Sequence, residues 1–328
     1  MHLDSRIKAL LGAASAAALL VGLTAGGGAA SAATKSAGGC TPATNIEAII
    51  DDSGSMFITD SSKFRTSLLD AFAALQQNQG KTLGGIEFGD TADVLFAPAS
   101  IPGVIPAMDA SFGLVDADNG GTDYNLAFAT AQSANPNANA RIFLSDGGHN
   151  VGTYNNGHLN PRIKTDTVGF GSVDPGLLNQ IASDTGGVAF NLSSSSQVPA
   201  VAAGITADLN CKAPPVTFTD AFSHQGQAFA HTFKATGTTA DILETWDNQA
   251  SSLDVTGFST GGKAGKASAS SLAQTAKKRG GKVKATKKAG KGFVTVHLRG
   301  LKRGSKIKFS VKAKTLAGST TGTASVIR

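Results

Sequence analysis

The chain has 328 residues, a length that fits two domains of ordinary size better than one. Residues 34–212 hold eight Lys and Arg against 17 Asp and Glu, whereas residues 213–328 hold 19 against five. This asymmetry separates an acidic module from a basic one, and without a second long apolar stretch we expect the mature protein to be soluble.

The first 33 residues are typical of a signal peptide. Arg6 and Lys8 precede an apolar run at 9–23, and Ala-Ser-Ala at 30–32 fits a signal-peptidase site. A membrane helix is the alternative, but the run is short and alanine-rich, while a span needs about 20 strongly apolar residues. We expect a secreted or surface-associated protein. The alanine- and glycine-rich composition resembles that of Gram-positive bacteria with high GC content. No hydrophobic tail or sorting motif ends the chain, so release or non-covalent retention is expected.

Residues 34–213 alternate between two kinds of pattern. Strand patterns occur at 45–51, 85–88, 94–96, 141–145, 163–170 and 187–191, and those at 45–51 and 141–145 are typical of buried strands. Helix patterns occur at 64–75, 124–133, 175–183 and 197–209. This alternation predicts an α/β domain, a mostly parallel sheet with helices on both faces.

Residues 214–328 read as a smaller all-β domain of the sandwich type. Short alternating segments occur at 216–219, 231–234, 242–246, 253–258, 293–298 and 306–312. Between them, 261–292 is a Gly, Lys, Ala and Ser tract, for which a long flexible loop is expected. Trp246 is interpreted as a core residue, with a ligand-binding surface as the alternative.

Cys40 and Cys211 are the only cysteines, and they bracket the acidic domain. An even count in an exported chain indicates a disulfide, with two buried free thiols as the alternative. Closing a ring of this size stabilises the fold by up to about 5 kcal/mol in the chain-entropy model.

Polar clusters follow three of the predicted strands or turns. Asp51, Ser53 and Ser55 form a D-x-S-x-S sequence, Thr122 follows two glycines, and Asp146 follows the strand at 141–145. Ligands of open parallel sheets bind beyond the carboxyl ends of the strands. We therefore expect these five side chains to meet in one crevice, against the alternative of ordinary polar turns.

Carboxylate and hydroxyl oxygens suit a hard divalent cation. Mg²⁺ is expected, with Mn²⁺ or Ca²⁺ as alternatives. Because three of the five donors are neutral hydroxyls, the ion keeps room for a further anionic oxygen, such as an Asp or Glu of a partner protein.

The sequences DDSGSM, GGTDYNLAF, FLSDGG and TVGFG with LNQIASDTGG resemble the successive motifs of von Willebrand factor A (vWA) domains, over 45–209. The resemblance implies a Rossmann-like vWA fold with a metal-ion-dependent adhesion site (MIDAS), whose hydroxyls bind the ion directly and whose aspartates often act through water. The site residues it implies are Asp51, Ser53, Ser55, Thr122 and Asp146. It also implies a disulfide between the domain's ends. The chain departs from the family at 147–161, where a helix is normal and no helical pattern occurs.

The resemblance implies a secreted, metal-dependent binding or adhesion protein. The alternative is a scaffold or an envelope protein that binds anionic polymers, in which the metal only stabilises the fold. No nucleophile elbow, H-E-x-x-H or Walker A sequence occurs, so an enzyme is not expected. His149 and His158 are interpreted as exposed loop histidines, with ligation of a softer ion as the alternative.

A basic tract lies in the predicted loop and continues to Lys288. Its residues are Lys277, Lys278, Arg279, Lys282, Lys284, Lys287 and Lys288. It suits an anionic wall polymer or acidic lipid headgroups, while a solvated loop is the alternative. Export and the absence of aromatic residues within the tract disfavour nucleic acid.

Overall fold

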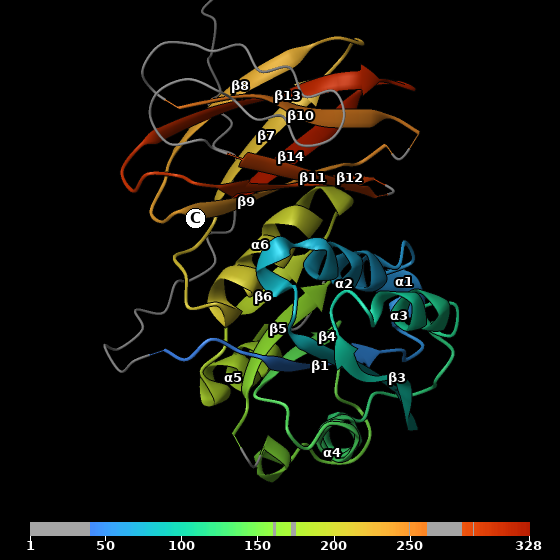
Figure 1. Cartoon of the computed structure of the whole chain (residues 1–328). Coiled ribbons are helices and arrows are strands. Elements are labelled where there is room, and N and C mark those ends of the chain that lie inside the picture. Colours follow the sequence, from blue (N-terminus) through green and yellow to red (C-terminus); the bar gives the residue numbers. More distant parts are fainter. Residues whose placement is uncertain (1–39, 160–161, 172–174, 249, 261–283, 291) are drawn as a thin grey trace, which may run out of the picture. The chain divides into compact units, whose positions relative to one another are not determined.

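The computed structural model describes residues 40–159, 162–171, 175–248, 250–260, 284–290 and 292–328 (Figure 1). The predicted signal peptide, most of the predicted loop at 261–292 and the residues Lys277, Lys278, Arg279 and Lys282 lie outside these ranges. None of the helices in the described ranges is long and apolar enough to cross a membrane.

The acidic part of the chain forms a six-stranded sheet in the order β3-β2-β1-β4-β5-β6. Its strands are β1 (Asn45–Asp51), β2 (Thr82–Phe88), β3 (Ala92–Ser100), β4 (Ala140–Ser145), β5 (Lys164–Phe170) and β6 (Ala189–Leu192). All neighbours are parallel except β2 and β3, which form a hairpin with Gly89 and Asp90 in its turn. The predicted Rossmann-like α/β fold is confirmed. The strand order reverses at β1, so the crevice between β1 and β4 is where such a sheet binds ligands.

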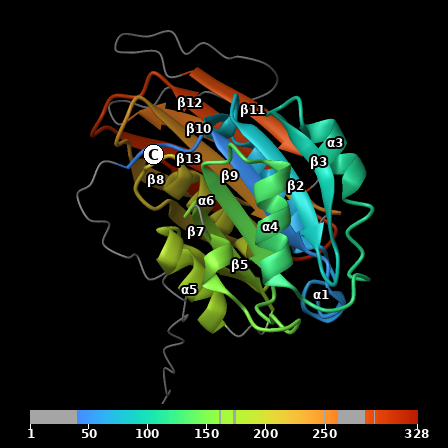
Figure 2. The same ribbon diagram turned by 90° about the horizontal axis from the view of Figure 1, so that it is seen from below.

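Helices cover both faces of this sheet (Figures 1 and 2). They are α1 (Met56–Thr59), α2 (Phe64–Ala74), α3 (Ile105–Ser111), α4 (Tyr124–Ala134), α5 (Pro175–Thr185) and α6 (Val198–Leu209), with 3₁₀ turns η1 (Gln76–Asn78), η2 (Asn156–Leu159) and η3 (Ser195–Gln197). Alternate residues of β1 face opposite ways: Ile50 packs with α2 and α6, and Ile49 packs with α4 and α5. β1 is therefore buried on both faces, which explains its continuous apolar sequence.

Two features of this domain differ from the sequence prediction or extend it. Helices α1 and α3 were not predicted, because four and seven residues are too few to show a helical period. Between β4 and β5, the described residues contain only the 3₁₀ turn η2, in agreement with the lack of a helical pattern at 147–161.

The basic part of the chain forms two antiparallel sheets, drawn as separate layers in Figure 1. Its strands are β7 (Val216–Phe222), β8 (Ala228–Lys234), β9 (Thr239–Trp246), β10 (Ser252–Thr260), β11 (Lys284–Gly290), β12 (Phe293–Arg299), β13 (Lys306–Thr315) and β14 (Thr320–Ile327). One sheet has the order β10-β13-β8 and the other β11-β12-β9-β14-β7. The predicted sandwich is confirmed.

Two strands of the sandwich were missed. β11 lies at the end of the tract for which a loop was predicted, and this part of the prediction is wrong. Among the described strands it pairs only with β12, and such an edge position tolerates lysines and needs few apolar residues. β14 is buried between β9 and β7, but its sequence TTGTASVI is too poor in large apolar residues to stand out.

The interior of the sandwich is mostly apolar, and Trp246 and Glu244 are two of its buried residues. Trp246 is buried, and its Nε1 donates to the carbonyl oxygen of Ser251 at 2.8 Å, so the core interpretation is confirmed. Glu244 is fully buried, and within the described ranges neither of its carboxyl oxygens has a hydrogen-bond partner. Burial, with a smaller contribution from Asp220, raises the pKa of Glu244 well above its usual range.

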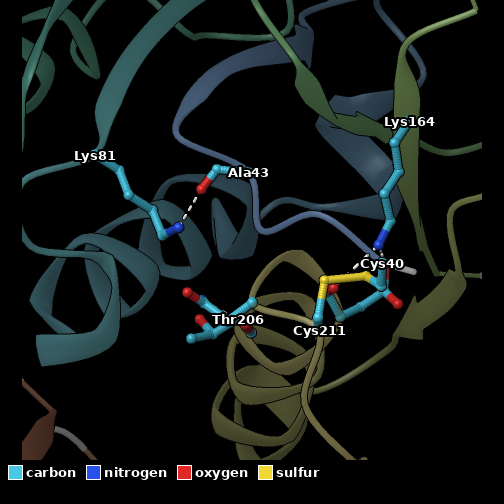
Figure 3. The surroundings of a disulfide bond; sticks show 8 residues. Cys40, Ala43, Lys81, Lys164, Thr206 and Cys211 are labelled. Carbon is cyan, nitrogen blue, oxygen red and sulfur yellow. Dashed lines mark hydrogen bonds and ion pairs between the residues drawn. A yellow bond between two sulfur atoms is a disulfide. The ribbon is translucent and has the colours of Figure 1, made fainter.

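The predicted disulfide between Cys40 and Cys211 is present (Figure 3). It links the segment before β1 to the turn that follows α6. The same two segments are joined by a hydrogen bond from the amide of Ala43 to the carbonyl oxygen of Leu209, at 2.8 Å. Lys81 adds a bond from its ammonium group to the carbonyl oxygen of Ala43. The two ends of the α/β domain are therefore fastened to each other.

Candidate metal site

Asp51 is the last residue of β1 and is fully buried between β2 and β4. Its Oδ1 accepts a hydrogen bond from the amide of Ser53 at 2.8 Å, and its Oδ2 accepts one from the Ser145 hydroxyl at 2.5 Å. Burial raises the pKa of Asp51 to about 6, against the hydrogen bonds from Ser145 and Ser53, and the nearby charge of Asp146 raises it further. An ionised Asp51 carboxylate would therefore be stabilised by a positive charge next to it.

Ser53 and Ser55 lie in the turn between β1 and α1. Ser53 is buried and Ser55 is exposed, and their hydroxyl oxygens are 3.3 Å apart. Neighbouring oxygens of an octahedral Mg²⁺ shell lie about 3 Å from each other, because each is about 2.1 Å from the ion. The serine pair therefore fits two adjacent positions of such a shell.

Asp146 follows β4, the strand next to β1, and is buried. Its Oδ2 accepts a hydrogen bond from the hydroxyl of Thr59, at 3.0 Å, at the end of α1. The hydroxyl oxygen of the preceding residue, Ser145, accepts a hydrogen bond from the amide of Gly147 at 3.2 Å. It lies 2.7 Å from the hydroxyl oxygen of Tyr124. Asp51 and Asp146 are thus held at the same edge of the sheet by hydrogen bonds that leave further carboxyl lone pairs free.

Thr122 lies in the loop before α4 and is buried. Its amide donates to the side-chain oxygen of Asn150 at 2.8 Å, and its carbonyl oxygen accepts the amide of Asn150 at 3.0 Å. Two residues earlier, the carbonyl oxygen of Gly120 accepts the amide of Gly54 at 2.9 Å. The loop is therefore bound both to the D-x-S-x-S turn and to the loop after β4.

Gly120 must be glycine for this loop to approach the site. Its φ is +60°, and a Cβ there would lie 2.0 Å from Oδ2 of Asp90. The helix that follows the loop begins at Asp123, whose Oδ1 accepts from the amides of Asn125 and Leu126. The double glycine and this N-cap fix where Thr122 lies.

The structure thus brings Asp51, Ser53, Ser55 and Asp146 together and places Thr122 in a loop bound to their segments. In the described ranges, no three or more His, Cys, Asp or Glu side chains are placed to hold a metal ion. The candidate donor set consists of two carboxylates and three hydroxyls, which suits a hard cation.

Sequence reasoning missed the residues that orient these donors. Ser145 and Thr59 each donate to one of the two carboxylates, and Tyr124 bonds Ser145 in turn. Ser145 had a signal, since it directly precedes Asp146 at the end of a predicted strand. Thr59 had none, because its contact with Asp146 spans 87 positions of the chain.

A buried arginine connects the D-x-S-x-S turn to α2. The Arg65 guanidinium donates to Oδ1 of Asp52 at 3.3 Å and to Oδ2 of Asp60 at 3.1 Å. The Asp60 carboxylate also accepts the amides of Phe64 and Arg65, which begin α2. All three charged groups are buried, so this ion-pair network is part of the domain's framework.

The interpretation of His149 as an exposed loop histidine needs correction. It is half-buried, its ring contacts those of Tyr124 and Tyr154, and its Nδ1 accepts the amide of Tyr124 at 3.2 Å. The residue thereby anchors the loop after Asp146 to the start of α4. The side chain of His158 lies outside the described residues.

No family model and no curated protein matches the chain. Among solved structures, von Willebrand factor type A from Catenulispora acidiphila is 15% identical, with 84% of this chain and 63% of that one covered and a TM-score of 0.41. An aerotolerance-related membrane protein from Bacteroides fragilis is 14% identical over 51% of this chain and 99% of that one, with a TM-score of 0.43.

Manganese-loaded TRAP protein from Plasmodium vivax is 18% identical over 44% of this chain and 64% of that one, with a TM-score of 0.34. The chain therefore spans just under two thirds of the Catenulispora and Plasmodium structures. At these identities and TM-scores, the similarity carries no argument about what the chain binds.

Proposed function

We propose that the protein is exported and uses its vWA-like domain to hold an acidic group of a partner protein through a divalent cation. Asp51, Ser53, Ser55, Thr122 and Asp146 would hold the ion, with Mg²⁺ as the expected occupant. The predicted signal peptide supports export, as does the disulfide, which persists in oxidising compartments.

The observation that carries this proposal is the convergence of Asp51 and Asp146 beside a pair of serine hydroxyls. The charge of Asp146 raises the pKa of the buried Asp51, so the two carboxylates repel each other. A divalent cation relieves that repulsion. The ion would supply positive charge at the sheet edge, and the chain's own hydrogen bonds would keep the donors in place.

Exposure favours a partner-binding ion over a purely structural one. Gly54, Ser55 and Gly148 are exposed, although Asp51, Ser53 and Thr122 are buried. The site is therefore closed toward the sheet and open on one side. A carboxylate from outside could approach on the open side, whereas an ion that only stiffened the sheet would need no such access.

Cation binding is tested by removing the two hydroxyls that fit the shell. Titration of the mature protein with Mg²⁺ or Mn²⁺ is expected to raise its stability by about 2.7 kcal/mol at 100 times the dissociation constant. The double variant Ser53→Ala/Ser55→Ala should lose this gain. The control Ser61→Ala/Ser62→Ala, which removes two exposed hydroxyls further along the same segment, should keep it. Equal melting with cation and with EDTA in the unaltered protein would contradict the proposal.

Partner binding is tested separately with peptides. A panel of immobilised peptides containing Asp or Glu, each matched by its Asn or Gln counterpart, is probed in Mg²⁺ and in EDTA. Capture that needs both the carboxylate and the cation supports the proposal. Cation-dependent stability without any such capture favours the structural alternative.

A further inference from the structure

The outer face of the three-stranded sheet carries a row of lysines. Along β13, exposed lysines alternate with the buried residues Ile307, Phe309, Val311 and Ala313. The directly paired position on β8 opposite Lys306 is a further exposed lysine. We call these five residues the lysine face: Lys234, Lys306, Lys308, Lys312 and Lys314.

The charges of the lysine face are not neutralised within the described part of the chain. None of its five side chains makes an ion pair or hydrogen bond there. The carboxylate nearest in register is Asp254 on β10, opposite Lys312, and it is already paired with Lys287 of β11. Like charges at directly opposed positions, such as Lys234 and Lys306, destabilise a sheet. The arrangement therefore has a cost in stability that no contact in the described ranges offsets.

Protection against aggregation does not explain these lysines. Proteins place lysine on edge strands to stop them pairing with other chains. β13, however, is the central strand of its sheet, paired with β10 on one side and β8 on the other. Four of the five lysines lie on it, at positions with no free strand edge to protect.

The geometry of the face suits an extended ligand. Residues two apart on a strand are about 7 Å from each other, so the row from Lys306 to Lys314 is about 27 Å long. The one gap in the row is Ser310, whose neighbours across the sheet are Ala230 and Thr256. Small side chains at this point leave a smooth path between the two pairs of lysines.

We propose that the lysine face binds a linear phosphodiester polymer laid along β13. Lysine is a common phosphate ligand, and a chain with one phosphate per short monomer repeats its charge at intervals comparable with the lysine spacing. Anionic wall polymers, expected from the sequence as partners of the basic domain, include this chemistry. The proposal places this contact on the outer face of a sheet rather than on the basic tract at 277–288.

Two other anionic partners fit this face less well. Single-stranded nucleic acid is bound with aromatic side chains that stack on bases, and a membrane surface is bound with apolar side chains that insert. Among the described residues, the exposed large hydrophobic side chains are Phe57, Ile58, Val94 and Leu114, all in the α/β domain. On this face of β13, the one residue other than lysine is Ser310, which offers neither an aromatic ring nor an apolar side chain.

The test uses the full mature protein and a fluorescently labelled poly(glycerol phosphate) of about 20 units. By analogy with single-stranded polyanions, five contacts predict an affinity loss of about 100-fold between 50 and 200 mM salt. The variant Lys308→Gln/Lys312→Gln should bind at least about 10-fold more weakly at 50 mM salt. Its loss over the same salt interval should fall to about 20-fold, because three contacts remain.

The matched control is Lys284→Gln/Lys288→Gln, which removes the same charge from exposed positions of β11. It should change the affinity less than about twofold, and EDTA should change none of these values, which separates this site from the cation site. Equal losses in both double variants would show that net charge alone attracts the polymer. Absence of binding at 50 mM salt would also overturn the proposal. So would equal or tighter binding of oligo(dT), polyglutamate or vesicles containing phosphatidylglycerol through the same lysines.

Discussion

Glu47 shows how strongly burial alters a single side chain in this protein. It lies on β1, fully buried, and the amide nitrogen of the Asn135 side chain donates to its Oε2 at 3.0 Å. Arg141 is its paired neighbour on β4. Burial raises the pKa of Glu47 to about 7, against the smaller opposing effects of Asn135 and Arg141. The folded protein thus binds this proton at a pH where the unfolded chain has released it.

This difference predicts a pH dependence of stability. Because the folded pKa of about 7 lies above the ordinary 4.5, the contribution of Glu47 is fully present below pH 4.5 and is lost as the pH rises to about 7. Glu47→Gln keeps the shape without the ionisation. Relative to the unaltered protein, the variant should gain up to about 3 kcal/mol between pH 4.5 and 7, measured by urea unfolding.

Ser61→Ala is a suitable control for this measurement, since Ser61 is exposed and its substitution removes no titratable group. Its unfolding free energy should differ from that of the unaltered protein by a nearly constant amount over the same pH range. Parallel curves for Glu47→Gln and the unaltered protein would show that Glu47 does not titrate differently in the two states.

At the residue scale, the sequence predicted those candidate site residues that follow a local pattern in the chain, either an apolar run or a double glycine. Asp51 and Asp146 each follow an apolar run, and Thr122 follows two glycines. Their orienting partners could not be predicted in this way. In the sequence, Arg65 looks like an ordinary charged residue of a helix. Its pairing with Asp52 depends on how α2 packs beside the D-x-S-x-S turn.

Among the elements, the turn between β2 and β3 controls the position of the loop that carries Thr122. A Cβ at Gly89 would lie 1.9 Å from the carbonyl oxygen of Asn119 and 2.7 Å from its side chain. Asn119 in turn donates its amide to the carbonyl oxygen of Asp52, at 3.1 Å. The glycine therefore permits the close approach of the loop to the D-x-S-x-S turn.

Gly89→Ala is expected to displace this loop and to weaken Mg²⁺ or Mn²⁺ binding at least about 10-fold, a loss of about 1.4 kcal/mol, measured by calorimetric titration. Gly237→Ala is the matched control, because a Cβ there meets nothing within 4 Å and Gly237 has no positive φ. Unchanged cation affinity in folded Gly89→Ala would mean that the loop position does not matter for the ion.

The elements that the sequence predicted well are those with a long or strongly apolar pattern, such as β1, α2 and α6. β14 was missed because its residues are mostly small, so its sequence does not show that the strand is buried. The burial comes from its position between β9 and β7. β11 was missed for the opposite reason. It is an edge strand rich in lysine, and such a sequence does not differ from that of a solvated loop.

For the molecule as a whole, the disulfide closes the α/β domain on itself. Cys40 and Cys211 are 171 positions apart, so the bond greatly restricts the unfolded chain. Cys40→Ser/Cys211→Ser is expected to lower the unfolding free energy by 2 to about 5 kcal/mol, measured by denaturant unfolding under oxidising conditions. A loss below about 1 kcal/mol would mean that the contacts of Ala43 with Leu209 and Lys81 hold the two ends without it.

The fold class of the α/β domain and of the all-β domain could be predicted from the sequence. Near Pro214-Pro215, both the hydrophobic period and the sign of the net charge change. Helix-strand alternation before that point and strands alone after it correspond to the observed sheets. The lysine face was not foreseen. KIKFSVK predicts a strand, but only the pairing of β13 on both sides shows that its lysines lie on the middle of a sheet.

The ion-pair network of Arg65 has a mechanical consequence. Asp52 directly follows Asp51, and the Asp60 carboxylate accepts the first amides of α2, so the Arg65 guanidinium connects the D-x-S-x-S turn to the start of α2. If the D-x-S-x-S turn shifts, the start of α2 must shift with it. Otherwise the buried guanidinium of Arg65 would lose its carboxylate partners, which is strongly unfavourable. A movement of the D-x-S-x-S turn would thus displace α2 as a rigid body.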